Sequence, residues 1–91
     1  MANTAIAIVR IMPQSPESNL EKIKESIREK MEKEGGKSIT FEEKPLAFGL
    51  KAIILKMAFP EEKGTDFIEE IISKIPEVSS ISIEDYRRAF G

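Results

Sequence analysis

The residues of this chain that could carry chemistry are mainly carboxylates, because it contains no histidine and no cysteine. Their absence excludes thiolate metal sites, cysteine nucleophiles and catalysis that depends on an imidazole base. Paired glutamates could hold a hard cation, and these pairs are Glu42-Glu43, Glu61-Glu62 and Glu69-Glu70. Each pair lies among lysines, so we expect solvated surface there, and we expect Tyr86 to pack at the end of a β-sheet. No metal site and no cofactor is predicted.

Phosphate, nucleic-acid and membrane binding are also disfavoured. A phosphate-binding loop of the GxxxxGK[ST] kind is absent. An RNA-binding sheet would present stacked aromatics on its two central strands, yet the first predicted strand has none and the third has only its terminal Phe59. The chain has 14 basic and 16 acidic residues, so its net charge of −2 leaves no broad basic surface for phosphates. The longest apolar stretch, Ala52–Leu55, is far shorter than the roughly 20 residues of a membrane-spanning helix. We therefore expect a cytoplasmic protein with no direct nucleic-acid or membrane contact.

Two segments are unusual enough to suggest a contact with another protein. The stretch 44–51, KPLAFGLK, places Phe48 between an alanine and a glycine in an otherwise polar connection. A loop aromatic flanked by small residues can project freely and fill a pocket of a partner. It can equally cover an edge of its own core, and both interpretations stay open. Near the end of the chain, Arg87 and Arg88 form a basic pair that on its own is most simply solvated surface.

Four segments have the composition and alternation of β-strands. The stretch 4–12, TAIAIVRIM, is rich in β-branched residues, and its odd-numbered residues are all apolar, so they should face the core. Residues 50–59 are apolar on both faces, which predicts a central strand that ends at Pro60. The predicted strands are 4–12, 38–43, 50–59 and 78–86, with a loop at 44–49.

Two segments have apolar residues at helical spacing. The first covers residues 20–34, with Ser18 as the N-cap of a capping box, and Gly35-Gly36 allows a left-handed helix terminus. The second covers residues 65–75, with Thr65 as its N-cap. The apolar residues are Leu20, Ile23, Ile27 and Met31 in the first helix, and Ile68, Ile71, Ile72 and Ile75 in the second.

The predicted elements follow the order βαββαβ, which is typical of a ferredoxin-like sandwich. In this α+β fold a four-stranded antiparallel sheet carries both helices on one face, where their isoleucine-rich stripes are buried. The opposite face is left open. The length of 91 residues suits one domain with a single core, so we expect residues 1–91 to form a single domain.

Three stretches together resemble one known family. They are Pro45-Leu46-Ala47-Phe48-Gly49-Leu50-Lys51, Gly64-Thr65-Asp66, and Val78-Ser79-Ser80-Ile81-Ser82-Ile83 followed by a basic tail. Over essentially its whole length the chain resembles the short archaeal form of translation elongation factor 1-beta. The resemblance implies the ferredoxin-like fold and guanine nucleotide exchange on elongation factor 1-alpha, the GTPase that delivers aminoacyl-tRNA. It implies no covalent chemistry, and a partner that is bound in its GDP-bound and nucleotide-free states.

The resemblance also implies which residues contact the GTPase. In that family the aromatic residue of the A-F-G segment enters a hydrophobic pocket of the partner, and Phe48 matches it. A basic side chain near the family's C-terminus reaches toward the magnesium and phosphate region, and Arg88, followed by Arg87, is the best match. The family commonly has lysine and one hydrophobic residue there, whereas this chain has Arg88-Ala89-Phe90-Gly91. The predicted partner-binding residues are Ala47, Phe48, Gly49, Lys51, Arg87 and Arg88.

The alternative is a small-ligand-binding or oligomerisation module of the same fold. Such a module would pair its sheets through the open face around Ile6 and Ile8. A stable homodimer without affinity for the GTPase would indicate this alternative, whereas the exchange factor is expected to be a monomer when free.

Overall fold

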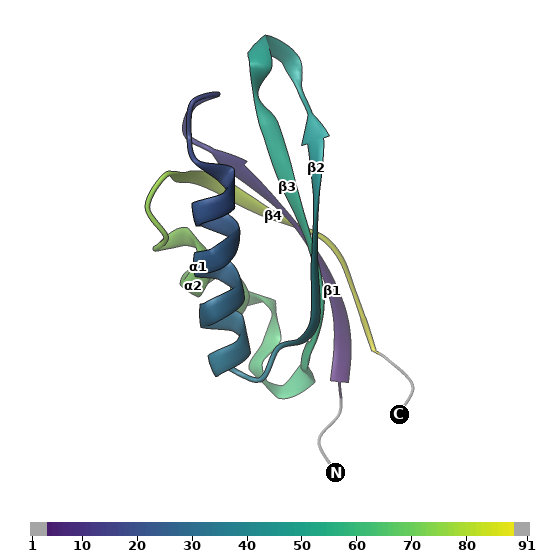
Figure 1. Cartoon of the computed structure of the whole chain (residues 1–91). Helices are drawn as coiled ribbons and strands as arrows, with labels where there is room; N and C mark the ends of the chain where they lie inside the picture. Colours follow the sequence, from purple (N-terminus) through teal and green to yellow (C-terminus); the bar gives the residue numbers. More distant parts are fainter. Residues whose placement is uncertain (1–3, 89–91) are drawn as a thin grey trace.

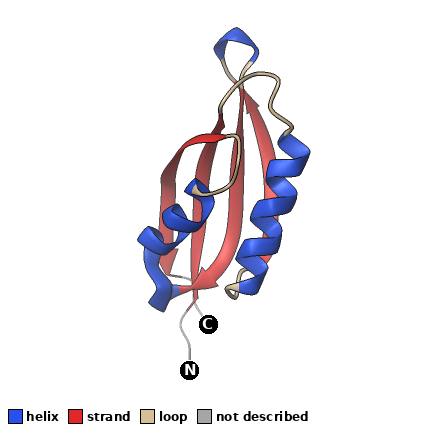
Figure 2. Cartoon of the chain, turned by 90° about the vertical axis from the view of Figure 1, so that its left-hand side faces the viewer, coloured by secondary structure: helices blue, strands red, loops and turns tan. Residues whose placement is uncertain are grey.

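The structure is a computed structural model that describes residues 4–88, and it consists of one sheet with two helices on one of its faces (Figures 1 and 2). The four strands are antiparallel and lie in the order β2-β3-β1-β4. The elements are β1 (Thr4–Pro13), α1 (Leu20–Lys33), β2 (Lys37–Pro45), the 3₁₀ turn η1 (Ala47–Gly49), β3 (Lys51–Pro60), the 3₁₀ turn η2 (Glu61–Lys63), α2 (Gly64–Ser73) and β4 (Val78–Arg88). The predicted ferredoxin-like fold is confirmed.

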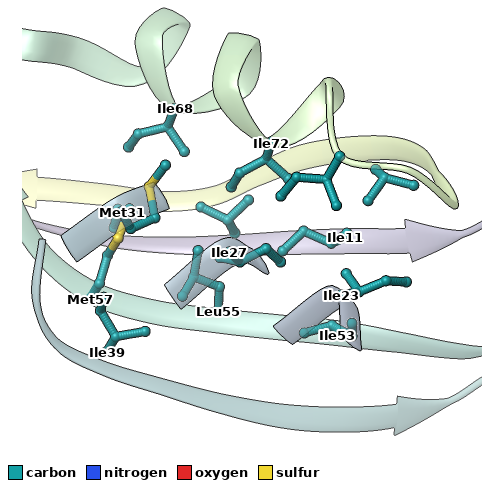
Figure 3. Packing of buried hydrophobic residues seen from close by; sticks show 14 of the residues in the cluster. Ile11, Ile23, Ile27, Met31, Ile39, Ile53, Leu55, Met57, Ile68 and Ile72 are labelled. Carbon is teal, nitrogen blue, oxygen red and sulfur yellow. The ribbon is translucent and has the colours of Figure 1, made fainter. Parts of the chain in front are cut away.

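The core lies between the sheet and the helices, as Figure 3 shows. Every second residue of the two central strands faces this core because strand side chains alternate between the two faces. The odd-numbered residues of β1 are fully buried, as predicted: Ala5, Ala7, Val9 and Ile11. Ala7, Val9 and Ile11 pack with Ile53, Leu55, Met57 and Phe59 of β3, Ile23, Ile27 and Met31 of α1, and Ile68 and Ile72 of α2. Because β3 lies between β2 and β1, the prediction that it is a central strand is confirmed.

The N-cap of helix α1 lies one residue later than predicted. The side-chain oxygen of Asn19 accepts a hydrogen bond from the backbone N–H of Lys22 at 3.1 Å, so Asn19 is the N-cap. The prediction of Ser18 was wrong because its hydroxyl is used elsewhere: it accepts from the backbone N–H of Ser15 at 3.2 Å, within the connection that precedes the helix.

The glycines that follow α1 form the left-handed terminus that the sequence predicted. Gly35 has φ of 100°, and its N–H donates to the carbonyl oxygen of Glu32 at 3.2 Å. The N–H of Gly36 donates to the carbonyl oxygen of Met31 at 2.7 Å. This pair of bonds is the Schellman arrangement, which satisfies carbonyl groups at the end of the helix.

Helix α2 begins before its predicted cap and ends before its predicted last residue. The helix starts at Gly64, directly after η2, and no side chain caps it, so the prediction of Thr65 as N-cap was wrong. Gly64, with φ of 73° and ψ of 172°, links η2 directly to the helix, which leaves Thr65 inside the first turn. The helix ends at Ser73, yet Ile75 is buried beyond it because its N–H donates to the carbonyl oxygen of Ile72.

Six strand ends also differ from the predicted boundaries, each by one or two residues. β2 continues to Pro45, because Lys44 and Pro45 still pair with β3, so the predicted loop is shorter. A proline is tolerated there because β2 is an edge strand. β3 begins at Lys51 instead of Leu50, and β4 extends to Arg88. The molecule is elongated, 45 × 21 × 19 Å, with the β2–β3 hairpin tip at one end and the ends of β1 and β4 that lie nearest the chain termini at the other (Figure 1).

Candidate functional site

The tip of the β2–β3 hairpin is a short connection, residues 46–50, closed by backbone hydrogen bonds. The N–H of Leu46 donates to the carbonyl oxygen of Leu50 at 2.7 Å, which joins the two sides of the tip. The N–H of Leu50 donates to the carbonyl oxygen of Ala47 at 3.3 Å, across η1. These bonds give the tip one backbone conformation without help from any side-chain hydrogen bond.

Phe48 lies at this tip in a left-handed backbone conformation, with φ of 62° and ψ of 29°. For a residue other than glycine this conformation costs about 1–2 kcal/mol. Its side chain is 93% exposed, and no other large hydrophobic residue between 4 and 88 is exposed. Of the two interpretations that the sequence left open, the structure therefore supports the projecting aromatic and contradicts the cover for a core edge.

Gly49 extends the left-handed segment and faces a neighbouring connection. Its φ of 78° is a value that side chains other than glycine rarely adopt. A methyl group on Gly49 would lie 3.7 Å from the Cβ atom of Pro16, which belongs to the connection between β1 and α1. Pro16 thus lies next to the tip, although the sequence analysis did not single it out.

Lys51, at the base of the tip, belongs to a chain of ion pairs instead of standing alone. Its Nζ atom lies 3.9 Å from Oε1 of Glu43, and Oε2 of Glu43 accepts a 2.6 Å hydrogen bond from Lys24 of α1. That hydrogen bond lowers the pKa of the Glu43 carboxyl and raises the pKa of Lys24 from their ordinary values. The pairs connect the hairpin base to α1, so Lys51 has a structural partner as well as its predicted partner-binding role.

Both C-terminal arginines also have carboxylate partners within the chain. Arg88 makes a bidentate contact with Glu61 of η2, with Nε to Oε2 at 2.9 Å and Nη2 to Oε1 at 2.8 Å. These hydrogen bonds raise the pKa of Arg88 above its ordinary value. Nη2 of Arg87 lies 2.8 Å from Oδ2 of Asp85 on the same strand. The side chains of Arg87 and Arg88 are nevertheless 72% and 69% exposed, which leaves both within reach of a partner.

Tyr86 packs beside this basic end, as predicted for the single tyrosine. Its hydroxyl donates to the backbone carbonyl oxygen of Glu61 at 3.3 Å, and its ring packs against the core. Burial, followed by the charge of Glu61, raises the pKa of Tyr86. The hydrogen bond places η2 next to β4, which brings the Glu61 carboxylate to Arg88.

The structure separates the two groups of predicted site residues. Arg88 pairs with Ala5 of β1, and Ala5 pairs with Phe59 of β3. At about 3.3 Å per residue, the length of β3 between Lys51 and Phe59 puts roughly 25–30 Å between the basic end and the tip. Ala47, Phe48, Gly49 and Lys51 are therefore together at one end, and Arg87 and Arg88 at the other. The two groups cannot meet in one pocket.

The residues that sequence reasoning missed act through contacts between distant segments. Glu61 was expected to be solvated surface, but it is partly buried, with 26% of its side chain exposed, and it holds Arg88. Its position directly after the predicted strand end at Pro60 was the only signal that could have placed it there. Between residues 4 and 88, no group of three or more acidic, histidine or cysteine side chains could hold a metal ion. Within the same range, neither helix is long and apolar enough to cross a membrane.

Comparisons with known proteins identify the family. The EF-1 guanine nucleotide exchange domain matches residues 6–89. A protein named elongation factor 1-beta from Methanocaldococcus jannaschii is 44% identical, over 86% of this chain and 89% of the relative. Relatives of the same name are each 40% identical in Methanococcus vannielii, over 88% and 91% of the two chains, and in Sulfurisphaera tokodaii, over 86% and 87%. The resemblance to the archaeal form is confirmed, and the chain belongs to the family of EF-1 guanine nucleotide exchange domains.

Proposed function

We propose that the chain binds elongation factor 1-alpha with both ends of its sheet at once. Its family gives it the role of a guanine nucleotide exchange factor in translation elongation, acting on that GTPase. In the proposed complex Phe48 fills an apolar pocket, and Arg87 or Arg88 approaches the magnesium and phosphate region of the nucleotide site. The observation that carries this proposal is the 93% exposed ring of Phe48 on a backbone held in the left-handed region.

The tip is suited to an apolar anchor. Burying a phenylalanine side chain contributes about 1.5–3 kcal/mol, and here almost none of that burial occurs within the free chain. The backbone bonds across residues 46–50 set the position of the Phe48 backbone before binding, so little backbone entropy remains to be lost, and only the two χ angles of the side chain are still to be fixed. Ala47 and Gly49 leave space on either side of the ring for the walls of a pocket.

The basic end is suited to the part of the GTPase that holds anions. A guanidinium near the magnesium site would replace some of the positive charge that is lost when the ion leaves, and it would compete for the metal's ligands. Arg88 would have to exchange Glu61 for an acceptor on the partner, whereas Arg87 would exchange Asp85. Both arginines remain candidates for this role.

Exchange by this means requires no covalent step. A protein accelerates GDP release when it binds the nucleotide-free GTPase more tightly than the GDP-bound form. At about 1.4 kcal/mol per decade, a thousandfold loss of GDP affinity requires about 4 kcal/mol of such preference. A buried aromatic anchor and one cation can supply this amount, so Phe48 and an arginine are sufficient in principle. We propose that the chain is not an enzyme for this reason.

The remaining features of the proposal concern the setting of the protein. We propose that residues 1–91 act as one exchange domain, monomeric when free, in the cytoplasm, without a membrane or direct nucleic-acid contact. Its partner is met with GDP bound and is left nucleotide-free or loaded with GTP. The oligomerisation or small-ligand module is not favoured, since the family match covers residues 6–89.

The test is the release of a fluorescent GDP analogue from purified elongation factor 1-alpha. We expect the wild-type chain to accelerate release, Phe48→Ala to lose most of the acceleration, and Lys74→Ala, an exposed position on the helix side, to match the wild type. In gel filtration the complex should form without nucleotide and separate when GDP is added. Wild-type acceleration by Phe48→Ala would overturn the anchor role.

A further inference from the structure

The face of the sheet opposite the helices has an uneven distribution of charge. We call this the open face. Between Ile6 and Met12 of β1 and between Ala52 and Ala58 of β3, this face carries only apolar and basic side chains, with no carboxylate. Its carboxylates lie on the edge strands, with Glu42 on β2, Asp85 on β4, and Glu84 at the β4 bulge without a paired residue. The central residues of the open face are Ile6, Ile8, Arg10 and Met12 of β1, and Ile54, Lys56 and Ala58 of β3.

The two central cations have no partner in the described part of the chain. Neither Arg10 nor Lys56 makes an ion pair or a side-chain hydrogen bond with another residue of 4–88. Arg10 is half-buried as a residue, and because no buried side-chain nitrogen between residues 4 and 88 lacks a partner, its guanidinium stays in contact with water and is available to a carboxylate. On the helix side, Lys24, Lys63 and Arg88 are paired with carboxylates, and the cations without an ion pair, such as Lys30 and Lys33, lie on the exposed side of α1 instead of in the middle of a sheet face. The open face would therefore gain from a partner that carries carboxylates.

The open face also connects the two ends of the molecule. Arg87 pairs with Ile6, so the basic end reaches onto this face, and Lys44 pairs with Ala52 close to the tip. One partner that contacts both Phe48 and an arginine must lie along some face between them. The opposite face is occupied by α1 and α2 up to the β2–β3 hairpin tip, which projects beyond both helices (Figures 1 and 2). A partner that contacts both ends can therefore lie along the open face without meeting the helices.

We infer that elongation factor 1-alpha docks along the open face with a surface that combines carboxylates and apolar side chains. This inference rests on the proposed function, and it extends the contact from the two ends to Arg10, Lys56 and the aliphatic residues between them. A second copy of the chain fits this face poorly, because a two-fold contact would bring the central cations of both copies together. Single-stranded RNA also fits poorly, because no aromatic residue of β1 or β3 lies on this face to stack with bases.

The experiment compares two double charge reversals that change the net charge equally. Arg10→Glu with Lys56→Glu alters the open face, and Lys30→Glu with Lys33→Glu alters the exposed side of α1. Binding to nucleotide-free elongation factor 1-alpha is measured at two salt concentrations, and thermal unfolding checks that each variant folds. We expect the open-face variant to bind about tenfold more weakly, with a smaller salt dependence, and the helix variant to stay within about twofold of the wild type.

A second measurement uses methyl resonances and does not depend on exchange activity. With the δ1 methyl groups of isoleucine labelled, added GTPase should perturb Ile6, Ile8 and Ile54 on the open face. Ile71, half-buried on α2, should change little. Equal weakening by the two charge reversals, or perturbation of Ile71 without Ile6 and Ile8, would overturn the inference.

The remaining outcomes separate this inference from the proposed function. If Phe48→Ala binds as tightly as the wild type while the open-face variant is weakened, the docking face stands and the two-ended anchor is wrong. If Phe48→Ala is weakened and the open-face variant is not, the anchor stands and the docking face is wrong. A wild-type dimer in sedimentation that the open-face variant abolishes would identify a second copy as the occupant and overturn the inference.

Discussion

The hairpin tip and the basic end of the sheet present their exposed groups in different ways. At the tip, Phe48 has no side-chain partner, and backbone hydrogen bonds across residues 46–50 set its position. At the basic end, Arg87 and Arg88 are each held by a carboxylate of the same chain. The Phe48 side chain needs no partner in the free chain, and its transfer from water into a pocket would be favourable. The guanidinium groups of Arg87 and Arg88 must first break their ion pairs with Asp85 and Glu61 before they can bind another anion. In the proposed complex the tip would therefore contribute affinity, whereas each arginine of the basic end would exchange a carboxylate of its own chain for an acceptor on the partner.

The largest expected effect comes from Phe48→Gly, because it should act on stability and exchange in opposite directions. Glycine adopts a φ of 62° without strain, so the variant should unfold at a higher temperature, with a gain of about 1 kcal/mol. Loss of the buried ring should lower the kcat/KM of exchange by about 10–100-fold. Calorimetry and fluorescent GDP release check the two halves. A parallel loss of stability and activity would contradict the account of the tip.

Arg88→Ala should have the next largest effect, and Arg88→Lys separates its charge from its geometry. Lysine keeps the positive charge but lacks the planar fork that binds carboxylate or phosphate in a bidentate manner. We expect exchange to fall about tenfold in Arg88→Ala and less in Arg88→Lys. Arg87→Ala is the matched control, one residue away on the other face of β4. If Arg87→Ala has the larger effect, the cation that reaches the nucleotide site is Arg87.

Gly49→Ala tests whether position 49 requires glycine for its left-handed backbone conformation or for lack of space for a side chain. A methyl group there would lie 3.7 Å from Pro16, which is ordinary contact, so only the φ of 78° should be unfavourable. We expect a loss of about 1 kcal/mol of stability, or roughly 4–8 °C in Tm for a domain of this size, together with a severalfold loss of exchange. Pro16→Ala changes the neighbouring side chain and leaves Gly49 itself in place, so it serves as the control. Unchanged thermal unfolding in Gly49→Ala would show that the tip relaxes freely.

The smallest effect concerns pH and the ion pairs at the base of the hairpin. Pairing with Lys24 lowers the pKa of Glu43, so the pair stabilises the fold above the ordinary carboxyl value of 4.5. That contribution is lost as the pH falls through the lowered pKa of Glu43. Because the pair is partly exposed, we expect it to contribute less than about 1 kcal/mol. Denaturant unfolding at pH 7 and pH 3 should show a smaller pH difference for Glu43→Gln than for the wild type, and Glu42→Gln is the control.

The order of the elements and the core could be predicted from the sequence because both follow from periodicity. The alternation of β1 and the isoleucine spacing of α1 and α2 are local patterns, and each one already defines the face that the structure buries. The exposed aromatic at the tip was one of two open interpretations. Its exposure depends on the left-handed φ of Phe48, and nothing in the residue type itself indicates that conformation.

The parts that could not be predicted depend on contacts between segments far apart in the chain. Asn19 caps α1 instead of Ser18 because the Ser18 hydroxyl accepts a hydrogen bond within the connection between β1 and α1. The start of α2 depends on η2, which local propensity did not predict. The pair of Arg88 and Glu61 joins residues of β4 and η2, which are brought together by the pairing of β1 with both β3 and β4 and by the hydrogen bond from Tyr86 to Glu61.

The stiffness of the four-stranded sheet adds a consequence for the proposed two-ended binding. A rigid spacer of roughly 25–30 Å between an anchor and a cation can engage only surfaces that are held at a matching separation. The chain would therefore bind selectively to the conformation of its partner in which the two contact surfaces have this separation. A GTPase whose parts shift apart or together with the bound nucleotide would be recognised in one arrangement and released in the other, without a change in the backbone of the exchange factor itself.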